Sequence, residues 1–291
     1  MKKFSLYIVV HIIIISSLLY FLDFFYTSIY KNNKVIRNKI EFIFQNKNKQ
    51  YDYIFLGSSR VEFHVNTNLI NKKTNKTSLN LGISGQNLTE TFLSLKLLNE
   101  NNLRAKKYFI QVDESDLNKN HKKSFLSASY FMPYINNIEV NKHLKKYDEN
   151  YFNNSKIPFY RYMNYGYKIG FRELLLKVGN KKRNKEFYIG LETLMTQDTI
   201  SSVFKNNYSS ELIKEIVDYG NSKNINIILY TSPYYNIKNE HKLKETLIKN
   251  NIHDYLDSIK KVNFFKDKGH LNKFGANKFT DMLIRDFKLK N

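Results

Sequence analysis

The chain has 291 residues, of which 42% are hydrophobic and 15% aromatic, enough for one sizeable folded domain or two small ones. This composition excludes intrinsic disorder as the main state. Lys and Arg number 47 against 26 Asp and Glu, a net charge of +21, and there is no cysteine, which excludes disulfides, thiolate metal sites and cysteine nucleophiles. Most of any chemistry must therefore come from hydroxyl groups and the seven histidines.

The first predicted element is a membrane-spanning helix. Residues 4–22 form a nearly continuous apolar run that follows Lys2 and Lys3 and precedes a cluster of aromatic residues suited to a membrane interface. As a helix this run extends about 28 Å, close to the hydrocarbon thickness of a bilayer. No small-x-small cleavage site follows it, which favours an uncleaved single-pass anchor over residues 1–30. A buried core helix is the alternative, but it would carry polar residues at helical spacing, which this run almost lacks.

The orientation of this anchor is not fixed by charge, because basic residues lie on both sides of the apolar run. A single N-terminal anchor before a long soluble domain most often places that domain outside the cytoplasm. We therefore expect a periplasmic or extracellular domain. Residues 31–50 are charged and polar with a short amphipathic patch, and they predict a juxtamembrane helix or tether.

Residues 51–291 alternate short apolar strands with helices. In chain order, the predicted elements are a strand at 51–56, a strand ending near Leu81, a helix at 87–98, a strand at 108–112, a helix at 212–219, a strand at 225–230 and a helix at about 273–287. This alternation predicts an α/β fold with a parallel sheet covered on both faces. Between about 118 and 204 no period is visible, and the stretch is long for a loop, so an irregular or helical insertion is expected there.

Two segments that follow predicted strands could carry chemistry. Gly57-Ser58-Ser59-Arg60 comes directly after the first strand, where a parallel sheet binds its ligands and a serine can present its hydroxyl and N–H to the crevice. Residues 80–87 (NLGISGQN) contain glycines that allow close backbone approach before a helix, where free amides suit an anion or oxyanion. Each segment alone is also typical of an ordinary turn.

The third segment, residues 265–275 (FKDKGHLNKFG), is the most informative. Asp267 precedes His270 by three residues, just before the last predicted helix. This spacing lets the carboxylate hold the imidazole in one tautomer as a general base. An isolated Asp-x-x-His is more often a surface pair, but its combination with the upstream Gly-Ser-Ser favours a catalytic site.

With these three segments, the chain resembles the SGNH (GDSL-like) hydrolase superfamily. The resemblance is to its membrane-anchored bacterial branch, which includes polysaccharide O-acetyltransferases and esterases and the D-alanyl-lipoteichoic acid biosynthesis protein. It implies a three-layer α/β/α flavodoxin-like sandwich over residues 51–291. It also implies Ser59 as the nucleophile, His270 as the base and Asp267 as its partner, with the amides of Ser59 and Gly85 holding the oxyanion. The Leu-Asn-x-x-Gly continuation after His270 also matches this branch.

The chain departs from the family pattern in two blocks. Ser58 stands where the family has Asp, and Arg60 stands where it has Leu. No Gly-x-Asn-Asp block follows the strand at 108–112, as is often true of the membrane-anchored branch, and this leaves the third oxyanion donor unassigned. Asn87 is a candidate substitute besides its expected role as a helix cap.

The resemblance implies a membrane-anchored, extracytoplasmic esterase or O-acyltransferase that acts on acyl esters of a cell-surface polysaccharide or related polymer. It requires no cofactor, and no histidine grouping has metal-ligand spacing. The implied partners are a cell-surface glycan or anionic polymer, the membrane, and either an acyl donor or a membrane-bound O-acyltransferase, with no nucleic acid among them. The alternative is a catalytically idle scaffold or polymer-binding subunit of a glycan assembly or acylation complex.

Two further interpretations are less favoured. An α/β-hydrolase elbow built on Ser84 would need a glycine at Gln86. Nucleic-acid binding, suggested by the charge, is not expected because the basic residues are scattered, and anionic lipids or polymers fit the charge better. The other histidines have no predicted partner, including His64, which is close to Ser59 in sequence.

Overall fold

The computed structural model describes residues 2–117, 127–181, 190–192, 195, 202–203, 208–238 and 241–290, and the chain divides into two compact units. A helical unit combines Met1–Asn46 with Ala128–Arg183, and an α/β unit combines Lys47–Ser127 with Asn184–Asn291. This grouping differs from the predicted anchor, tether and single domain with an insertion. The segment expected as an insertion packs instead against the residues that follow the apolar run.

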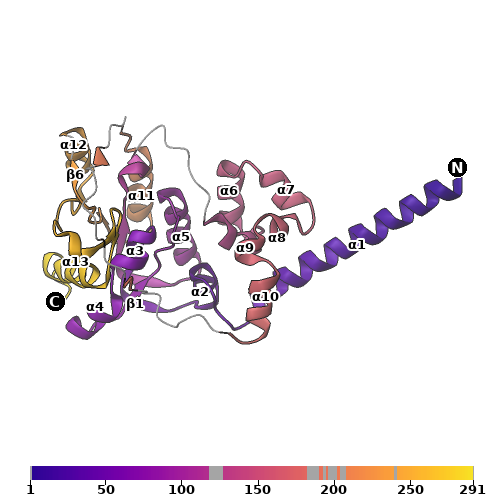
Figure 1. Ribbon diagram of the computed structural model, residues 1–291, viewed down its shortest axis with the longest axis horizontal. Helices are drawn as coiled ribbons and strands as arrows, with labels where there is room; N and C mark the ends of the chain where they lie inside the picture. The colour runs from indigo at the N-terminus through magenta and orange to yellow at the C-terminus, as the bar shows by residue number, and fades with distance from the viewer. Residues whose placement is uncertain are drawn as a thin grey trace. The chain divides into compact units, whose positions relative to one another are not determined.

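The α/β unit is built on a sheet of five parallel strands in the order β2-β1-β3-β5-β7 (Figure 1). The strands are β1 (Gln50–Leu56), β2 (Ser78–Asn80), β3 (Arg104–Gln111), β5 (Ile227–Tyr230) and the two-residue β7 (Ile252–His253). Phe55 of β1 lies between Asn80 of β2 and Phe109 of β3. The predicted parallel sheet is confirmed.

Helices cover both faces of this sheet, as the alternating pattern predicts (Figure 1). On one face lie α3 (Ser59–His64), α4 (Thr67–Thr74) and α13 (Lys273–Asp286), and on the other lie α5 (Leu88–Glu100) and α11 (Glu211–Ser222). The smaller elements are α12 (His241–Lys249), β4 (Ser202–Val203), β6 (Ile237–Lys238) and the 3₁₀ turns η1 (Glu114–Leu117) and η4 (Val262–Phe264). Ile54, Phe55 and Leu56 are completely buried, because β1 is covered on both sides.

The loop after β2 is held against α3 by two features of its sequence. The Asn80 side-chain amide donates to the carbonyls of Val61 and Val65, at 2.7 and 2.8 Å, which satisfies carbonyls at the end of α3. A Cβ atom at Gly82 would lie 2.4 Å from the Glu62 nitrogen and 2.5 Å from Val61 Cβ. Only glycine therefore permits this approach, which brings the second motif segment against the helix that begins with Ser59.

The third motif segment forms a small hairpin before the last helix. Antiparallel β8 (Phe265–Asp267) and β9 (His270–Leu271) place Asp267 opposite His270. Asn272 then caps α13, since its side-chain oxygen accepts from the amides of Phe274 and Gly275. The hairpin and the cap together fix the position of the histidine relative to the helix behind it.

The helical unit contains the N-terminal helix and five helices from the segment expected as an insertion. Its elements are α1 (Lys2–Asn32), α2 (Lys39–Gln45), α6 (Ile138–Tyr147), α7 (Tyr151–Lys156), α8 (Tyr160–Asn164), α9 (Gly166–Ile169), α10 (Phe171–Val178) and the 3₁₀ turns η2 (Ala128–Tyr130) and η3 (Met132–Tyr134). The expected helical character is confirmed for this part. Residues 118–126 and most of 182–207 lie outside the described residues.

Helix α1 is long and apolar enough to cross a membrane, by length and composition, as an anchor or a signal sequence would be. From Asp23 onward it is built into the helical unit. The Asp23 carboxylate pairs with Arg161 at 2.5 Å and accepts from the Phe159 amide at 2.7 Å. One turn later, the Thr27 hydroxyl lies 2.7 Å from that of Tyr162. The last third of α1 is therefore part of the folded core of this unit.

Candidate active site

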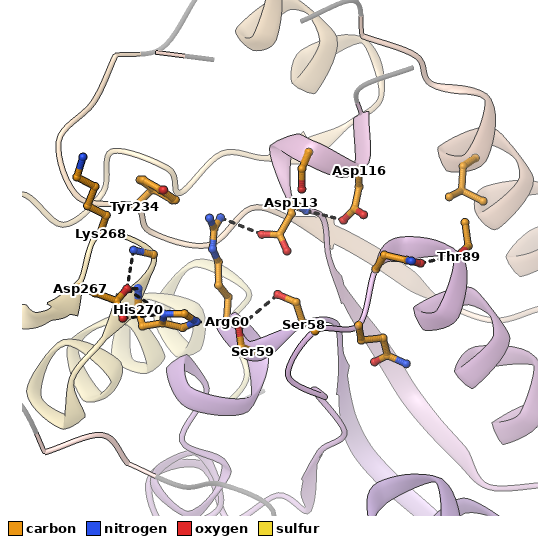
Figure 2. A pocket seen from close by; sticks show the side chains of 16 residues that line it. Ser58, Ser59, Arg60, Thr89, Asp113, Asp116, Tyr234, Asp267, Lys268 and His270 are labelled. Carbon is orange, nitrogen blue, oxygen red and sulfur yellow. Dashed lines mark hydrogen bonds and ion pairs between the residues drawn. The ribbon is translucent and has the colours of Figure 1, made fainter. Parts of the chain in front are cut away.

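The three residues predicted to form a catalytic triad lie in hydrogen-bonding contact (Figure 2). Ser59 Oγ is 2.8 Å from His270 Nε2. His270 Nδ1 is 2.9 and 3.0 Å from the two oxygens of Asp267. The structure thus brings together a hydroxyl and an imidazole that are 211 residues apart in the sequence, with a carboxylate on the far side of the imidazole, the order that a catalytic triad requires.

The two adjacent serines have different environments, which favours Ser59 as the nucleophile. Ser58 is buried and caps α3, and its amide and hydroxyl both donate to Gln111 Oε1, at 3.2 and 3.0 Å. Ser59 is the first residue of α3, and its hydroxyl meets the imidazole instead. The predicted register, with Ser59 rather than Ser58 facing the base, agrees with this geometry.

The Asp267 carboxylate sets the tautomer of His270. Its Oδ1 also accepts from the backbone amides of Gly269 and His270, at 3.0 and 2.9 Å, so an anionic acceptor is held in place. His270 Nδ1–H donates to it, which leaves Nε2 to accept the proton of Ser59. The Asp267 side chain is half exposed, so solvent screens its charge more than in a buried triad.

The predicted oxyanion donors are the amides of Ser59 and Gly85, and both residues line the same cavity. Among the described residues, neither of these amides donates to another protein group. Gly85 has a φ of +80°, a conformation that favours glycine and turns the chain beside the cavity. Asn87 caps α5, accepting from the Glu90 amide at 3.1 Å in a capping box, so the expected capping role is confirmed. Its role as a third oxyanion donor stays a prediction.

The site opens into a cavity of about 590 Å³ with a polar wall. Arg60 stands in this wall and pairs with Asp113 at 2.9 Å and Glu114 at 3.3 Å, and its guanidinium lies 4.6 Å from the centre of the Tyr234 ring. The two departures from the family pattern therefore meet, because Arg60 follows β1 and Asp113 follows the adjacent β3. The sequence contained a signal for this ion pair, since a basic residue follows one predicted strand and an acidic run follows another. Comparison with the family motifs alone did not reveal the pair.

Asp116 is a further carboxyl group at the cavity, besides Asp113 and Asp267, and it is partly protonated near neutral pH. Its oxygens accept from the amides of Leu88 and Asp113, at 3.0 and 3.1 Å. Burial, followed by the charge of Asp113, raises the pKa of Asp116 to about 7. The cavity wall therefore carries less negative charge at neutral pH than its acidic residues suggest.

The expectation that His64 has no partner is wrong. His64 is completely buried, its Nε2 accepts from the Leu271 amide at 2.9 Å, and its Nδ1 lies 2.8 Å from Ser232 Oγ. Burial, with the nearby charge of Arg60, lowers the pKa of His64 well below 6.5, so the ring is neutral and Nδ1–H donates to Ser232. His64 thus holds the residue that follows His270.

We expect His64→Leu to slow the reaction of Ser59 with a serine-directed fluorophosphonate by roughly tenfold, because a net hydrogen bond contributes about 0.5–1.5 kcal/mol to holding the hairpin. His64→Gln can still accept from Leu271 and should recover most of the rate. The measurement is the labelling rate against pH, with thermal unfolding alongside. Equal rates in the leucine and glutamine variants would contradict this positioning role.

Neither family models nor curated proteins match this chain. The resemblance to SGNH hydrolases therefore remains a prediction that depends on the three segments and their geometry. No group of three or more His, Asp and Glu that could hold a metal ion occurs within the described parts of the chain.

Proposed function

We propose that this protein is a membrane-anchored, extracytoplasmic serine esterase or O-acyltransferase of the SGNH type, with a flavodoxin-like α/β/α domain. Its substrates are acyl esters of a cell-surface polysaccharide or related polymer. The observation that carries the proposal is the continuous contact from Ser59 through His270 to Asp267 at the wall of an open cavity. The amides of Ser59 and Gly85 at that cavity, which donate to no group among the described residues, support an oxyanion site.

The geometry supports a two-step acyl transfer. Ser59 Oγ attacks the acyl carbonyl while His270 Nε2 takes its proton, and Asp267 stabilises the resulting imidazolium. The amides of Ser59 and Gly85 stabilise the oxyanion. As the tetrahedral intermediate collapses, His270 returns the proton to the leaving alcohol, and acyl-Ser59 remains. Water or an acceptor hydroxyl then attacks with His270 again as base, which releases the acyl group and restores Ser59.

The contacts of α1 support an anchor that is retained. A cleavage site within residues 24–30, shortly beyond the apolar run, would remove Asp23 and leave the buried Arg161 without its carboxylate. A site beyond residue 30 would also remove Tyr30, which is 2% exposed within the helical unit. A signal peptide is removed from the mature protein, so side chains within it do not contribute to the folded core in this way.

We expect a reporter that is active only in the periplasm to be active when fused after Asn291, and a reporter that works only in the cytoplasm to be silent. The reason is that α1 is the one candidate membrane span found among the described residues. Enzyme assays of both fusions in intact cells provide the measurement. The reverse pattern would contradict the cell-surface location while leaving the serine chemistry open.

The reaction itself is tested by incubating the full chain in mild detergent with an O-acetylated polysaccharide. We expect free acetate, or transfer of the acetyl group to an added unacetylated polymer, and neither product with Ser59→Ala. If the wild type binds the polymer but forms neither product, the alternative of a polymer-binding scaffold replaces the proposed enzyme.

A further inference from the structure

Helix α10 exposes an apolar stripe on the surface of the helical unit. Phe171, Leu175 and Val178 are 64%, 52% and 55% exposed, and their spacing of four and three residues places them on one side of the helix. The adjoining side of the helix is buried, with Leu174 at 5% and Lys177 at 0%. The apolar surface of α10 therefore continues from its buried side onto an exposed stripe, which no described residue of this unit covers.

Neighbouring elements of the same unit expose further large apolar side chains. Together with the α10 stripe they make up the set of exposed side chains that we call the α7–α10 apolar face, on or directly after helices that each contact the next: Phe152, Ile157, Met163, Tyr167, Phe171, Leu175 and Val178. In the described part of the much larger α/β unit, only Val217, Ile248 and Phe274 are comparably exposed. Apolar surface on this scale marks an interaction site rather than the ordinary scatter of surface residues.

The contacts of α1 place this face beside the end of the apolar run. The segment between α7 and α8 contacts α1 at Asp23, whose carboxylate accepts a hydrogen bond from the backbone N–H of Phe159. The Tyr26 and Phe159 rings pack edge to face 4.9 Å apart. Helix α10 meets α1 at Tyr30, whose ring lies 5.2 Å from Lys177 Nζ. Along the helix, Tyr26 lies about 6 Å beyond Leu22, within the layer of lipid headgroups, and Tyr30 lies about 12 Å beyond it, at the water side of that layer.

The charge of the helical unit fits an anionic lipid surface. Residues 23–46 and 128–183, the parts of this unit that follow the apolar run, contain 15 Lys and Arg against 6 Asp and Glu, so they carry +9 of the chain's +21 charge. Lys156, Lys168 and Arg172 are exposed and adjoin residues of the α7–α10 apolar face in sequence. Basic residues beside an exposed apolar helix face are typical of helices that lie in the membrane interface.

We infer that the helical unit docks on an anionic lipid surface through the α7–α10 apolar face, next to the point where α1 enters the bilayer. This inference rests on the proposed anchor. The helical unit would then have a role separate from the active site. It would contact the membrane surface beside the single span formed by α1. Such a contact fixes the unit against the membrane instead of leaving it free to pivot about α1.

The absence of cysteine makes this docking directly measurable. Single-cysteine variants of the full chain, Phe171→Cys and Leu175→Cys, are labelled with an environment-sensitive fluorophore and reconstituted into vesicles of phosphatidylcholine and phosphatidylglycerol. Lys145→Cys, at an exposed position between the exposed Lys142 and Lys146 of α6, is the matched control, and Ile14→Cys reports the span. Lipids that carry a nitroxide near the headgroup or deep in the acyl chain quench the labels by depth.

We expect labels at 171 and 175 to shift to the blue and to be quenched by the headgroup nitroxide, and the label at 145 to stay unquenched. Leaving out phosphatidylglycerol should reduce quenching at 171 and 175, and an unchanged signal would contradict the anionic preference. Quenching at Ile14 alone contradicts the docking and leaves the anchor in place. No quenching at any position contradicts both. A blue shift at 171 without lipid quenching would mean that a second copy of the chain covers the face, which also contradicts lipid docking.

Discussion

A serine-directed fluorophosphonate is expected to label the full chain in mild detergent at Ser59, and Ser59→Ala should abolish the labelling. His270→Ala should suppress it almost as fully, because a serine hydroxyl without a base within hydrogen-bonding distance is a poor nucleophile near neutral pH. Asp267→Asn should have a smaller effect. The corresponding change lowers turnover in serine proteases by about 10⁴, and the half-exposed Asp267 has more competition from solvent.

The matched control for this experiment is Ser58→Ala. Ser58 caps α3 and binds Gln111, so its loss should lower the free energy of unfolding by about 1 kcal/mol while labelling at Ser59 continues. Peptide mass spectrometry locates the label and thermal unfolding reports the cap. Labelling at Ser58 in the wild type would move the nucleophile by one residue. An unlabelled but folded wild type would contradict an activated serine.

The second large effect is expected in the helical unit, where Lys177 and Glu41 form an ion pair that is completely buried. Lys177 Nζ lies 2.9 Å from the carboxylate and 2.8 Å from the Val35 carbonyl. Lys177→Met would leave a buried carboxylate without its cation, and we expect it to lower the free energy of unfolding by about 3–5 kcal/mol. Lys177→Met with Glu41→Gln removes both charges and should recover most of this loss.

The loss should also depend on pH in a definite direction. Burial raises the pKa of Glu41 above its usual value, and removing Lys177 removes the group that opposes this shift. A carboxyl group with a raised folded-state pKa contributes stability at low pH and loses it as the pH rises through that value. Lys177→Met should therefore be least destabilising in acid. Hydrogen exchange over residues 128–181, which reports this unit separately, is the measurement, and equal losses in the single and double variants would contradict the account.

The sheet and the contact among Ser59, His270 and Asp267 could be predicted from the sequence because the signals for both are short and local. Apolar runs such as that of β3 indicate buried strands, and parallel strands end at one edge of a sheet. Ser59 follows the end of β1 and Gly85 follows the end of β2. Asp267 and His270 lie instead in a separate antiparallel hairpin and are recognised by their spacing and by the family resemblance. Their meeting with Ser59 could therefore be expected once the strands and the motif segments were assigned, even though Ser59 and His270 are far apart in sequence.

The remaining features depend on tertiary contacts that no local pattern encodes. His64 lies on a six-residue helix, and its partners Ser232 and Leu271 follow β5 and end β9. The grouping of 128–181 with the N-terminal helices depends on pairs such as Lys177 with Glu41, which are 136 residues apart. Periodicity indicates that this segment is helical, but it does not say what the helices pack against.

The most direct test of the proposed enzyme is capture of the acyl-Ser59 intermediate. The full chain is mixed with a reactive acetate ester such as p-nitrophenyl acetate, quenched in acid at short times, digested and analysed by peptide mass spectrometry. The account predicts an acetyl group on Ser59 that appears within the first turnover, decays once the ester is consumed, and fails to form in His270→Ala. Ester cleavage that leaves Ser59 unmodified at every time point, or that persists in Ser59→Ala, would contradict it.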